Sequence, residues 1–514
     1  MVMGIAFGTS ATVWNKRFKP DFKGKFSYVN YKDLDDEKKP FEFPVKNERL
    51  SIASASDFKK IPSSPIAYWV TERVRRIFEG SQSLSPVCKP AQGLATGDND
   101  RFVRNWHEVC FSTIGFSFPN RNQAKISCLK WFPYNKGGTF RRWYGNQDFV
   151  VNWENDGYRI KNFSDESGRL RSRPQNLETY FKESISWSKI SSGSPAFRYF
   201  PSGFIYDVAG TSIFCDDPSL MFRAIGYCNS RVTKKFLEIL SPTLNFEVGH
   251  VASLPIIPRA GSMTISQRLI GKSKQDWDSC ETSWDFNTFP LIDPEHRRSS
   301  IKATYQNLRA HWQGMTLEMQ RLEEENNRIF IDAYGLQDEL TPDVPLEEIT
   351  LTCNPYYRYG NKKSDPELES LLLADTMREF LSYAVGCMFG RYSLDRPGLI
   401  LANQGETADD YIKKVDLPKE EISFVPDEDN VLPITEGEYF ADDIVARFKK
   451  FLRVTFGDEY YEKNLAFIER ALGKDIRKYF LSDFYSHHVR MYKKRPIYWL
   501  FSSPRKTFNA LIYM

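Results

Sequence analysis

Arginine residues alternate with large aromatic residues between positions 101 and 198 of this 514-residue chain. A guanidinium group can pair with a guanine edge or a phosphate through two hydrogen bonds, and a flat aromatic ring can stack on a base. The pattern therefore favours a nucleic-acid contact, with a solvated protein surface as the structural alternative. The basic residues singled out in this stretch are Arg101, Arg141, Arg142, Arg169, Arg171, Arg173, Lys189 and Arg198.

Three of these residues, Arg169, Arg171 and Arg173, occur in the loop-like sequence GRLRSRPQN, which is well suited to enter a groove of DNA. A run of charges is more often a solvated loop, so the residues alone leave both interpretations open. Lys189 and Arg198 flank a Ser-Ser-Gly-Ser-Pro turn, whose backbone could donate hydrogen bonds to phosphates.

The segment that contains Gly93, Thr96, Gly97 and Asp98 invites comparison with phosphate-binding loops. No lysine follows at P-loop spacing and no GxGxxG string is present, which excludes the known nucleotide-binding loops. We interpret the glycines as a tight turn that brings the backbone close to DNA, with a purely structural turn as the alternative.

Other catalytic or metal chemistry finds little support in the residues. His487 and His488 lack a nucleophile elbow, and no nuclease-like carboxylate and lysine string is present. The eight cysteines are never closer than 13 positions, which excludes a CxxC zinc site. The N-terminus has neither the basic nor the apolar region of an export signal, and no apolar run would span a membrane. We therefore expect a cytoplasmic chain with reduced cysteines, no metal and no membrane contact.

The elements that would position these residues follow from the hydrophobic periodicity. With 41% hydrophobic and 26% charged residues, the composition is that of a globular protein of two or three domains. Short apolar runs predict strands, and spacings of three and four predict helices. The tryptophans Trp131, Trp143 and Trp187 are expected in the core rather than as base-stacking platforms. Predicted strands lie at 2–7, 26–31, 148–153, 185–189, 203–208 and 211–215, and predicted helices at 68–78, 218–240, 299–336 (a coiled-coil arm is one reading), 366–389 and 440–456.

Several of these segments resemble a known family. The sequence GLATGDNDRF at 93–102 resembles the opening motif of target recognition domains in large adenine-specific methyltransferases that combine restriction and modification. KWFPYNKGGTFRRWYGN at 130–146 resembles the basic loop of that class, and residues 186–214 resemble its central strands. Within the class the chain resembles the PglX family of BREX phage-defence systems, and this resemblance extends to 354–360, 390–400 and 495–514.

The resemblance implies an α/β, mixed α+β fold in three parts. Residues 1–62 would be the tail of a Rossmann-like methyltransferase domain, residues 63–260 a β-rich target recognition domain, and residues 261–514 a mainly helical domain with a long helix near 299–336. Duplex DNA would be the partner, and the residues singled out above at 93–101, 141–142, 169–173, 189 and 198 would contact it. In the family's complete enzyme, S-adenosylmethionine donates a methyl group to a flipped adenine.

The resemblance also predicts what this chain does not do alone. The family's glycine-bearing cofactor loop and Asn-Pro-Pro-Tyr motif are not found before residue 63, so we expect no cofactor binding and no catalytic residue. Asn354 to Tyr357 differ from that motif at one position and lie in the family's C-terminal region, which favours a structural role. A split subunit that docks onto a separately encoded catalytic half, or onto other BREX components, and a remnant of a longer gene both remain open. An alternative function is a non-enzymatic interaction protein that uses its long helix.

Overall fold

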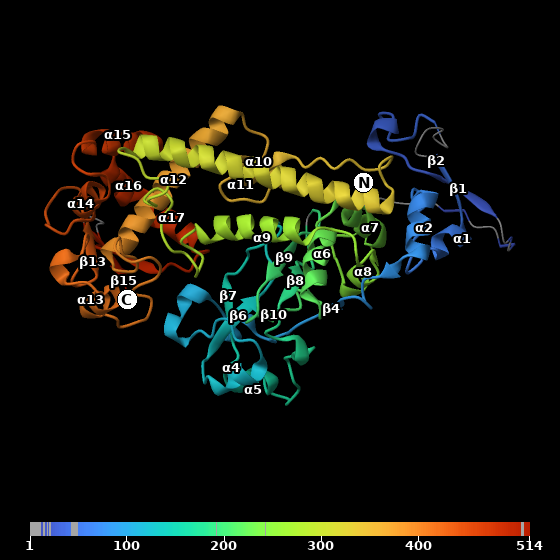
Figure 1. Cartoon of the computed structure of the whole chain (residues 1–514), viewed down its shortest axis with the longest axis horizontal. Helices are drawn as coiled ribbons and strands as arrows, with labels where there is room; N and C mark the ends of the chain where they lie inside the picture. The colour runs from blue at the N-terminus through green and yellow to red at the C-terminus, as the bar shows by residue number, and fades with distance from the viewer. Residues whose placement is uncertain are drawn as a thin grey trace.

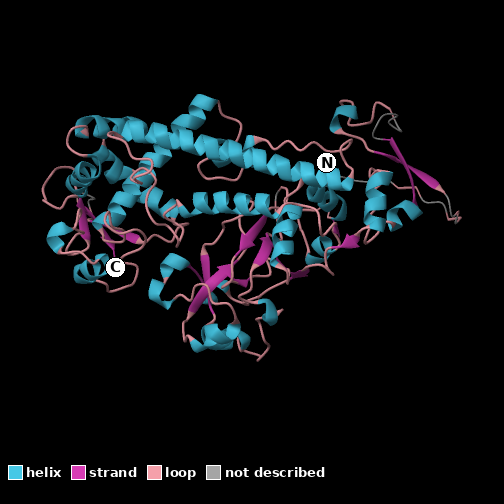
Figure 2. Cartoon of the chain, in the orientation of Figure 1, coloured by secondary structure: helices cyan, strands magenta, loops and turns pink. Residues whose placement is uncertain are grey.

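The computed structural model describes residues 12–13, 16–17, 19, 22–42, 50–191, 193–241, 243–504 and 508–513. Two long helices, α9 (Met263–Asp278) and α10 (Ile301–Tyr334), run side by side along the molecule (Figure 1). Most strands lie on one side of this pair, and the later helices gather around the end of α10 near residue 301 (Figure 2). The predicted mixed α+β fold is confirmed.

An N-terminal hairpin projects from the opposite end of the molecule (Figure 1). Its strands β1 (Lys23–Ser27) and β2 (Leu50–Ser54) pair antiparallel, and the short helices η1 (Tyr31–Asp33) and α1 (Ala55–Lys59) accompany them. No described side chain between residues 22 and 42 is buried. The Phe26 ring of the hairpin stacks on Tyr68 with 4.9 Å between centroids, and Asp57 of α1 pairs with Arg75 at 3.7 Å. The strand predicted at 2–7 lies outside the described residues.

The β-rich part contains two four-stranded sheets, with strand orders β10-β6-β7-β5 and β4-β11-β8-β9. The strands predicted at 148–153, 185–189, 203–208 and 211–215 are confirmed as β7, β8, β10 and β11. The strands are β3 (Gln82–Ser83), β4 (Lys89–Ala91), β5 (Val103–Asn105), β6 (Trp131–Asn135), β7 (Phe149–Asn152), β8 (Ser184–Trp187), β9 (Phe197–Phe200), β10 (Ile205–Tyr206), β11 (Ser212–Phe214) and β12 (Pro255–Ile256). The helices among them are α2 (Glu72–Gly80), α3 (Asn99–Phe102), η2 (Trp106–Glu108), η3 (Phe111–Thr113), α4 (Arg121–Ile126), α5 (Glu154–Lys161) and η4 (Leu177–Thr179).

The single helix predicted at 218–240 is wrong. The structure has α6 (Pro218–Cys228) and α7 (Arg231–Leu240), followed by α8 (Val248–Ala252). The break has a local cause, because the Asn229 side chain bonds to both backbone groups of Phe197 instead of continuing the helix. Ser230 then caps α7 by accepting a hydrogen bond from the Thr233 N–H.

The C-terminal part is mainly helical, as predicted, and also contains an unpredicted sheet of strand order β13-β15-β14. Its strands are β13 (Val431–Ile434), β14 (Tyr498–Ser502) and β15 (Asn509–Tyr513). Its helices after α10 are η5 (Leu346–Glu348), α11 (Pro355–Tyr359), α12 (Asp365–Met388), α13 (Ala408–Val415), η6 (Lys419–Glu421), α14 (Ile444–Phe456), α15 (Tyr461–Leu472), α16 (Ile476–Ser482) and α17 (Phe484–Met491).

Helix α10 is not a free coiled-coil arm. Its buried residues run from Ile301 to Tyr334, and it packs against α9, α7 and α15. Met315, Met319 and Phe330 of α10 belong to the same hydrophobic core as Trp143 and Ile185 of the β-rich part. A second core holds the C-terminal helices and the inner face of their sheet. The long helix is therefore a shared support that fixes the β-rich part against the C-terminal part.

The expectation that all eight cysteines are reduced is wrong for one pair. Cys88 and Cys215 form a disulfide, and the other six cysteines are free. The two cysteines come together because β4 and β11 pair antiparallel with Lys89 opposite Phe214. Cys88 precedes Lys89 and Cys215 follows Phe214, so the two cysteines form the adjacent opposed pair. Among the described residues, no group of three or more His, Cys, Asp or Glu side chains could hold a metal ion. No described helix has the length and apolar character that crossing a membrane requires.

Candidate nucleic-acid interface

The opening loop, residues 93–98, is held tightly against the β-rich core. The Leu94 N–H donates to the Tyr206 carbonyl at 2.7 Å, and a Cβ on Gly93 would lie 1.9 Å from that same oxygen. Gly97 has a φ of +78°, a backbone conformation that favours glycine. Asp98 caps α3 by accepting a hydrogen bond from the Arg101 N–H at 3.0 Å. In this structure the close approach of the glycines is to protein backbone, as in the purely structural alternative, and contact of this turn with DNA stays a prediction.

The arginine loop, residues 163–173, lies directly beside the opening loop. Ala95 and Arg173 exchange two backbone hydrogen bonds, of 2.8 and 3.1 Å, and the Arg171 N–H donates to the Phe163 carbonyl. Asp165 closes the turn by accepting hydrogen bonds from Ser167 and from the Arg169 N–H, and the Ser167 hydroxyl in particular lowers the pKa of Asp165. Two segments far apart in sequence therefore form one braced surface.

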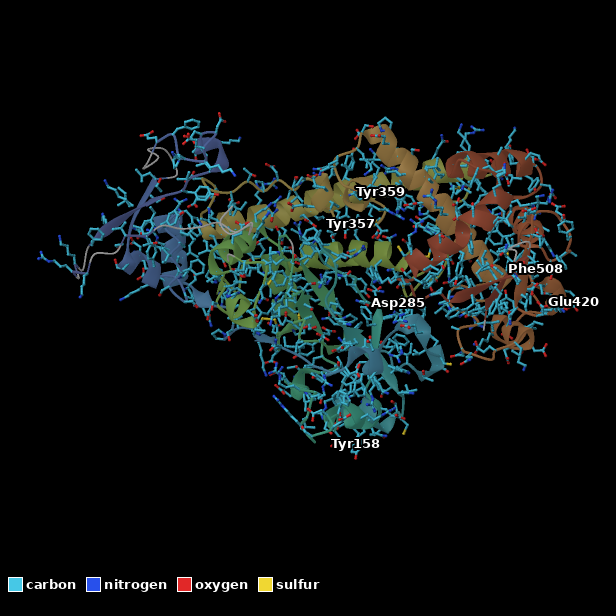
Figure 3. All side chains as sticks on the ribbon, turned by 180° about the vertical axis from the view of Figure 1, so that it is seen from behind. Tyr158, Asp285, Tyr357, Tyr359, Glu420 and Phe508 are labelled. Atoms are coloured by element: carbon cyan, nitrogen blue, oxygen red, sulfur yellow. A yellow bond between two sulfur atoms is a disulfide. The ribbon has the colours of Figure 1, made fainter. Side chains whose placement is uncertain are left out.

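Four of the predicted basic contact residues are exposed on this surface: Arg101, Arg169, Arg171 and Arg173. None of the four forms an ion pair with any described residue. The Arg101 guanidinium lies 5.1 Å from the centroid of the Phe163 ring, which orients this side chain along the surface. Leu170, between two of the arginines, is also exposed. Figure 3 labels Tyr158 of the neighbouring α5 at the outer tip of this part of the molecule.

The structure corrects the assignment of Arg141, Arg142 and Arg198 to the DNA surface, because all three side chains are buried. Arg141 pairs with Asp276 of α9 at 2.7 Å. Arg142 pairs with Glu323 of α10 and with Glu348. The guanidinium groups of Arg141 and Arg142 thus lie inside the protein, where they connect the β-rich part to the long helices.

Arg198 differs from the other two because it forms no ion pair with any carboxylate in the described part of the chain. Its guanidinium donates to the Arg141 carbonyl and to the Ser188 hydroxyl, each at 3.2 Å. Burial lowers the pKa of Arg198 to about 10, and the nearby charge of Arg141 acts in the same direction. Lys189 is partly buried and pairs with Glu247 at 3.0 Å, so it does not join the exposed arginines either. Ser192 of the adjoining turn lies outside the described residues.

The aromatic residues behave as expected from composition. Trp143 and Trp187 are fully buried and Trp131 almost so, which confirms their placement in the core. Their indole N–H groups have internal uses, since Trp143 donates to Glu323 at 2.7 Å and Trp187 to the Phe246 carbonyl at 2.8 Å. None of the three is a base-stacking platform in this structure.

Asn354 and Tyr357 have structural roles. The buried Asn354 side chain donates to the Leu346 and Ile349 carbonyls and caps α11 by accepting from the Tyr356 N–H. The Tyr357 hydroxyl donates to the Phe140 carbonyl at 2.5 Å, and so holds the loop that precedes Arg141. The Asn354 side chain, which would bind an adenine in an Asn-Pro-Pro-Tyr site, is already bonded within the protein.

Sequence spacing alone identifies few of the carboxylates that pair with the buried Arg141 and Arg142. Asp276, Glu323 and Glu348 stand 135, 181 and 206 positions from their arginine partners. Only Glu323 carried a usable signal, because it follows Met319 by four positions and so shares the buried face of α10. Burial raises the pKa of Glu323, against the opposing influence of Arg142 and the Trp143 indole.

No protein-family model matches the chain. Two curated proteins resemble it over most of its length. It is 37% identical over 99% of its length to an adenine-specific methyltransferase PglX of Lacticaseibacillus casei (strain Zhang). It is 34% identical over 89% of its length to an adenine-specific methyltransferase BrxX of Escherichia coli O9:H4 (strain HS). The chain spans 42% of the first relative and 38% of the second.

Proposed function

The chain is of PglX type over nearly its whole length, and we propose that it is the DNA-recognition portion of an adenine-specific DNA methyltransferase of a BREX phage-defence system. In this role it binds duplex DNA and selects the target site. Methyl transfer from S-adenosylmethionine to a flipped adenine then belongs to a part of the longer protein that this chain does not span.

The observation that carries the proposal is the exposed arginine group on the two braced loops. Arg101, Arg169, Arg171 and Arg173 form no ion pair with a described residue, although the charge of Arg171 helps to lower the pKa of Asp165, whereas Arg141 and Arg142, a short distance away in sequence, are paired with buried carboxylates. Unpaired guanidinium groups on a fixed backbone suit both phosphates and guanine edges. The neighbouring exposed Leu170 adds an apolar group that fits against bases or sugars.

The N-terminal hairpin supports the second part of the proposal, a docking partner that supplies catalysis. Phe22, Tyr28, Phe41 and Ile52 are more than half exposed there, at 58%, 54%, 73% and 58%. A two-stranded hairpin is marginally stable alone, and exposed apolar side chains on it favour contact with another surface. We propose that the methyltransferase portion, on the same or a separate polypeptide, covers this hairpin and carries the cofactor.

The test is binding of duplex DNA to the purified chain across a salt series. We expect affinity to fall steeply with salt, since phosphate contacts release counterions. Replacing Arg171 and Arg173 by alanine should weaken binding at least tenfold and reduce the salt slope by about two, one for each lost phosphate contact.

The matched control removes two charges elsewhere. Lys302 and Lys362 are exposed on α10 and on the loop before α12, away from the arginine loop, and their alanine variants should bind DNA as the parent does. Equal loss in both double variants would mean nonspecific attraction, and no binding at low salt would reject the proposal. Methyl transfer from labelled S-adenosylmethionine by this chain alone would reject the proposal that catalysis belongs to a portion that this chain does not span.

A further inference from the structure

The C-terminal sheet has two edges of different chemistry. β15 lies in the middle of the sheet. The Ser503 N–H donates to the Phe508 carbonyl and the Tyr513 N–H to the Asn430 carbonyl, and these two bonds show which residue pairs on each side of β15 are hydrogen-bonded. In antiparallel pairs, hydrogen-bonded and non-bonded positions alternate. In this register the backbone N–H and C=O groups of Trp499 and Phe501 point toward β15. The backbone groups of Leu500 and Ser502 point away from β15, to the outer edge of β14.

The outer edge of β13 is protected against further pairing. Its outward residues are Val431 and Pro433, by the same alternation. Proline has no N–H to donate, and the Val431 N–H is already bonded to Asp427 and Asp429. Proline and charged groups are the usual means by which an edge strand avoids pairing with another chain.

The edge of β14 has no such protection. The strand reads YWLFS, without proline or charge, and Leu500 and Ser502 have no hydrogen-bond partner on the outer side among the described residues. Its neighbour on the other side, β15, is the only strand paired with it in the described part of the chain. The backbone N–H and C=O groups of these two residues are therefore available to pair with an added strand.

The same sheet exposes aromatic side chains on one face along β14, while Ala510 and Pro433 further across that face are buried. Trp499, Phe501 and Phe508 share this face, because directly opposed residues point to the same side, and they are 49%, 54% and 40% exposed. Phe440, 46% exposed, extends the patch, with its ring 5.9 Å from that of Phe508. On the opposite face Tyr498 and Leu511 are fully buried, whereas Ser502 at the end of β14 is exposed. Figure 3 labels Phe508 in the C-terminal lobe, far from the arginine loop near Tyr158.

We propose that the free edge of β14 and its aromatic face dock a β-strand supplied by the portion of the PglX-type protein that this chain does not span. An added strand would bond to Leu500 and Ser502 and place apolar side chains over Trp499 and Phe501. The length of the relatives supplies the argument for this occupant, since more than half of each lies outside the region matched by this chain. The inference rests on the proposed role as one portion of a larger protein and is independent of DNA binding.

The experiment is hydrogen–deuterium exchange of this chain beside the full-length relative from L. casei, resolved to single residues by fragmentation in the mass spectrometer. In this chain the Leu500 and Ser502 amides should exchange as open amides. At the aligned positions of the relative, exchange should be at least a hundredfold slower. Leu511, bonded to β13 in the sheet centre, is the internal reference and should be protected in both proteins.

Two results would overturn the inference. Equally fast exchange at the aligned strand of the relative would mean that the remaining chain leaves this edge open. Protection of Leu500 and Ser502 in this chain that rises with protein concentration, together with a doubled mass in light scattering, would identify a second copy as the occupant. Loss of DNA binding affects neither readout, so failure of the DNA-recognition role would be recognised separately.

Discussion

Arg141 of the β-rich part and Asp276 of α9 form an ion pair with 2.7 Å between Nη2 and Oδ2, and both side chains are almost completely buried. The same carboxylate accepts the backbone N–H groups of Thr352 and Cys353 at 2.7 and 3.0 Å. One side chain thus joins the loop at 130–146, the helix α9 and the segment before α11. Because an unpaired buried charge is costly, this junction should depend strongly on the carboxylate.

Replacing Asp276 by alanine should therefore lower the free energy of unfolding by about 3–5 kcal/mol, since it leaves Arg141 buried without a partner. Urea denaturation gives the value. The control is Asp338→Ala, which removes a surface pair with Arg73 at 3.2 Å and should cost about 0–1 kcal/mol. Similar losses in both variants would contradict a special role of the buried pair.

The buried Glu281 should make stability depend on pH. Burial raises its pKa to about 7, against an ordinary value of 4.5, although the hydrogen bond from the Tyr492 hydroxyl opposes this. The folded protein then holds a proton that the unfolded chain releases, so this contribution to stability is present below pH 4.5 and is lost as pH rises through 7. Glu281→Gln keeps an acceptor for Tyr492 and does not titrate.

We expect the Gln variant to gain stability relative to the parent by about 2–3 kcal/mol more at pH 8 than at pH 5. Chemical denaturation at the two pH values measures the difference. Glu462→Gln on the exposed face of α15 serves as the control and should show no such dependence. A parent and a Gln variant with parallel pH profiles would show that Glu281 does not titrate in this range.

The disulfide between Cys88 and Cys215 closes 127 residues of chain and should stabilise the β-rich part. Replacing both cysteines by serine should lower the free energy of unfolding by about 2–4 kcal/mol. Thiol titration of the unfolded protein, prepared without reductant, should find six of the eight cysteines reactive. Finding all eight reactive would show that the bond does not form, and Cys110→Ser is the control for stability.

Local patterns predicted the elements well where one physical cause dominates. The helix at 299–336 and the strand at 148–153 follow from hydrophobic periodicity alone, and the structure has α10 and β7 there. The sheet of β13, β14 and β15 was not predicted, because β13 and β14 come together only through β15 and lie more than 60 residues apart in sequence.

The arginines of the candidate site were likewise predicted correctly in part. Arg171 and Arg173 are exposed, as a charged loop suggests, whereas Arg141 and Arg142 look the same in sequence and are buried. What separates them is a set of distant carboxylates that only the packing of α9 and α10 brings near. Charge type and loop context are readable from sequence, but the pairing of a charge is a tertiary property.

Gly97 and Gly168 allow the opening loop to be tested against a matched position, since both have positive φ, +78° and +80°, on the same surface. A Cβ on Gly97 would lie 2.9 Å from the Arg171 backbone, while nothing lies within 4 Å of one on Gly168. Gly168→Ala should cost only the backbone strain, about 1–2 kcal/mol. Gly97→Ala should cost more in thermal unfolding and should also weaken DNA binding, because it pushes the arginine loop away from the opening loop. Equal effects of the two substitutions on DNA affinity would mean that contact between the two loops does not position the arginines.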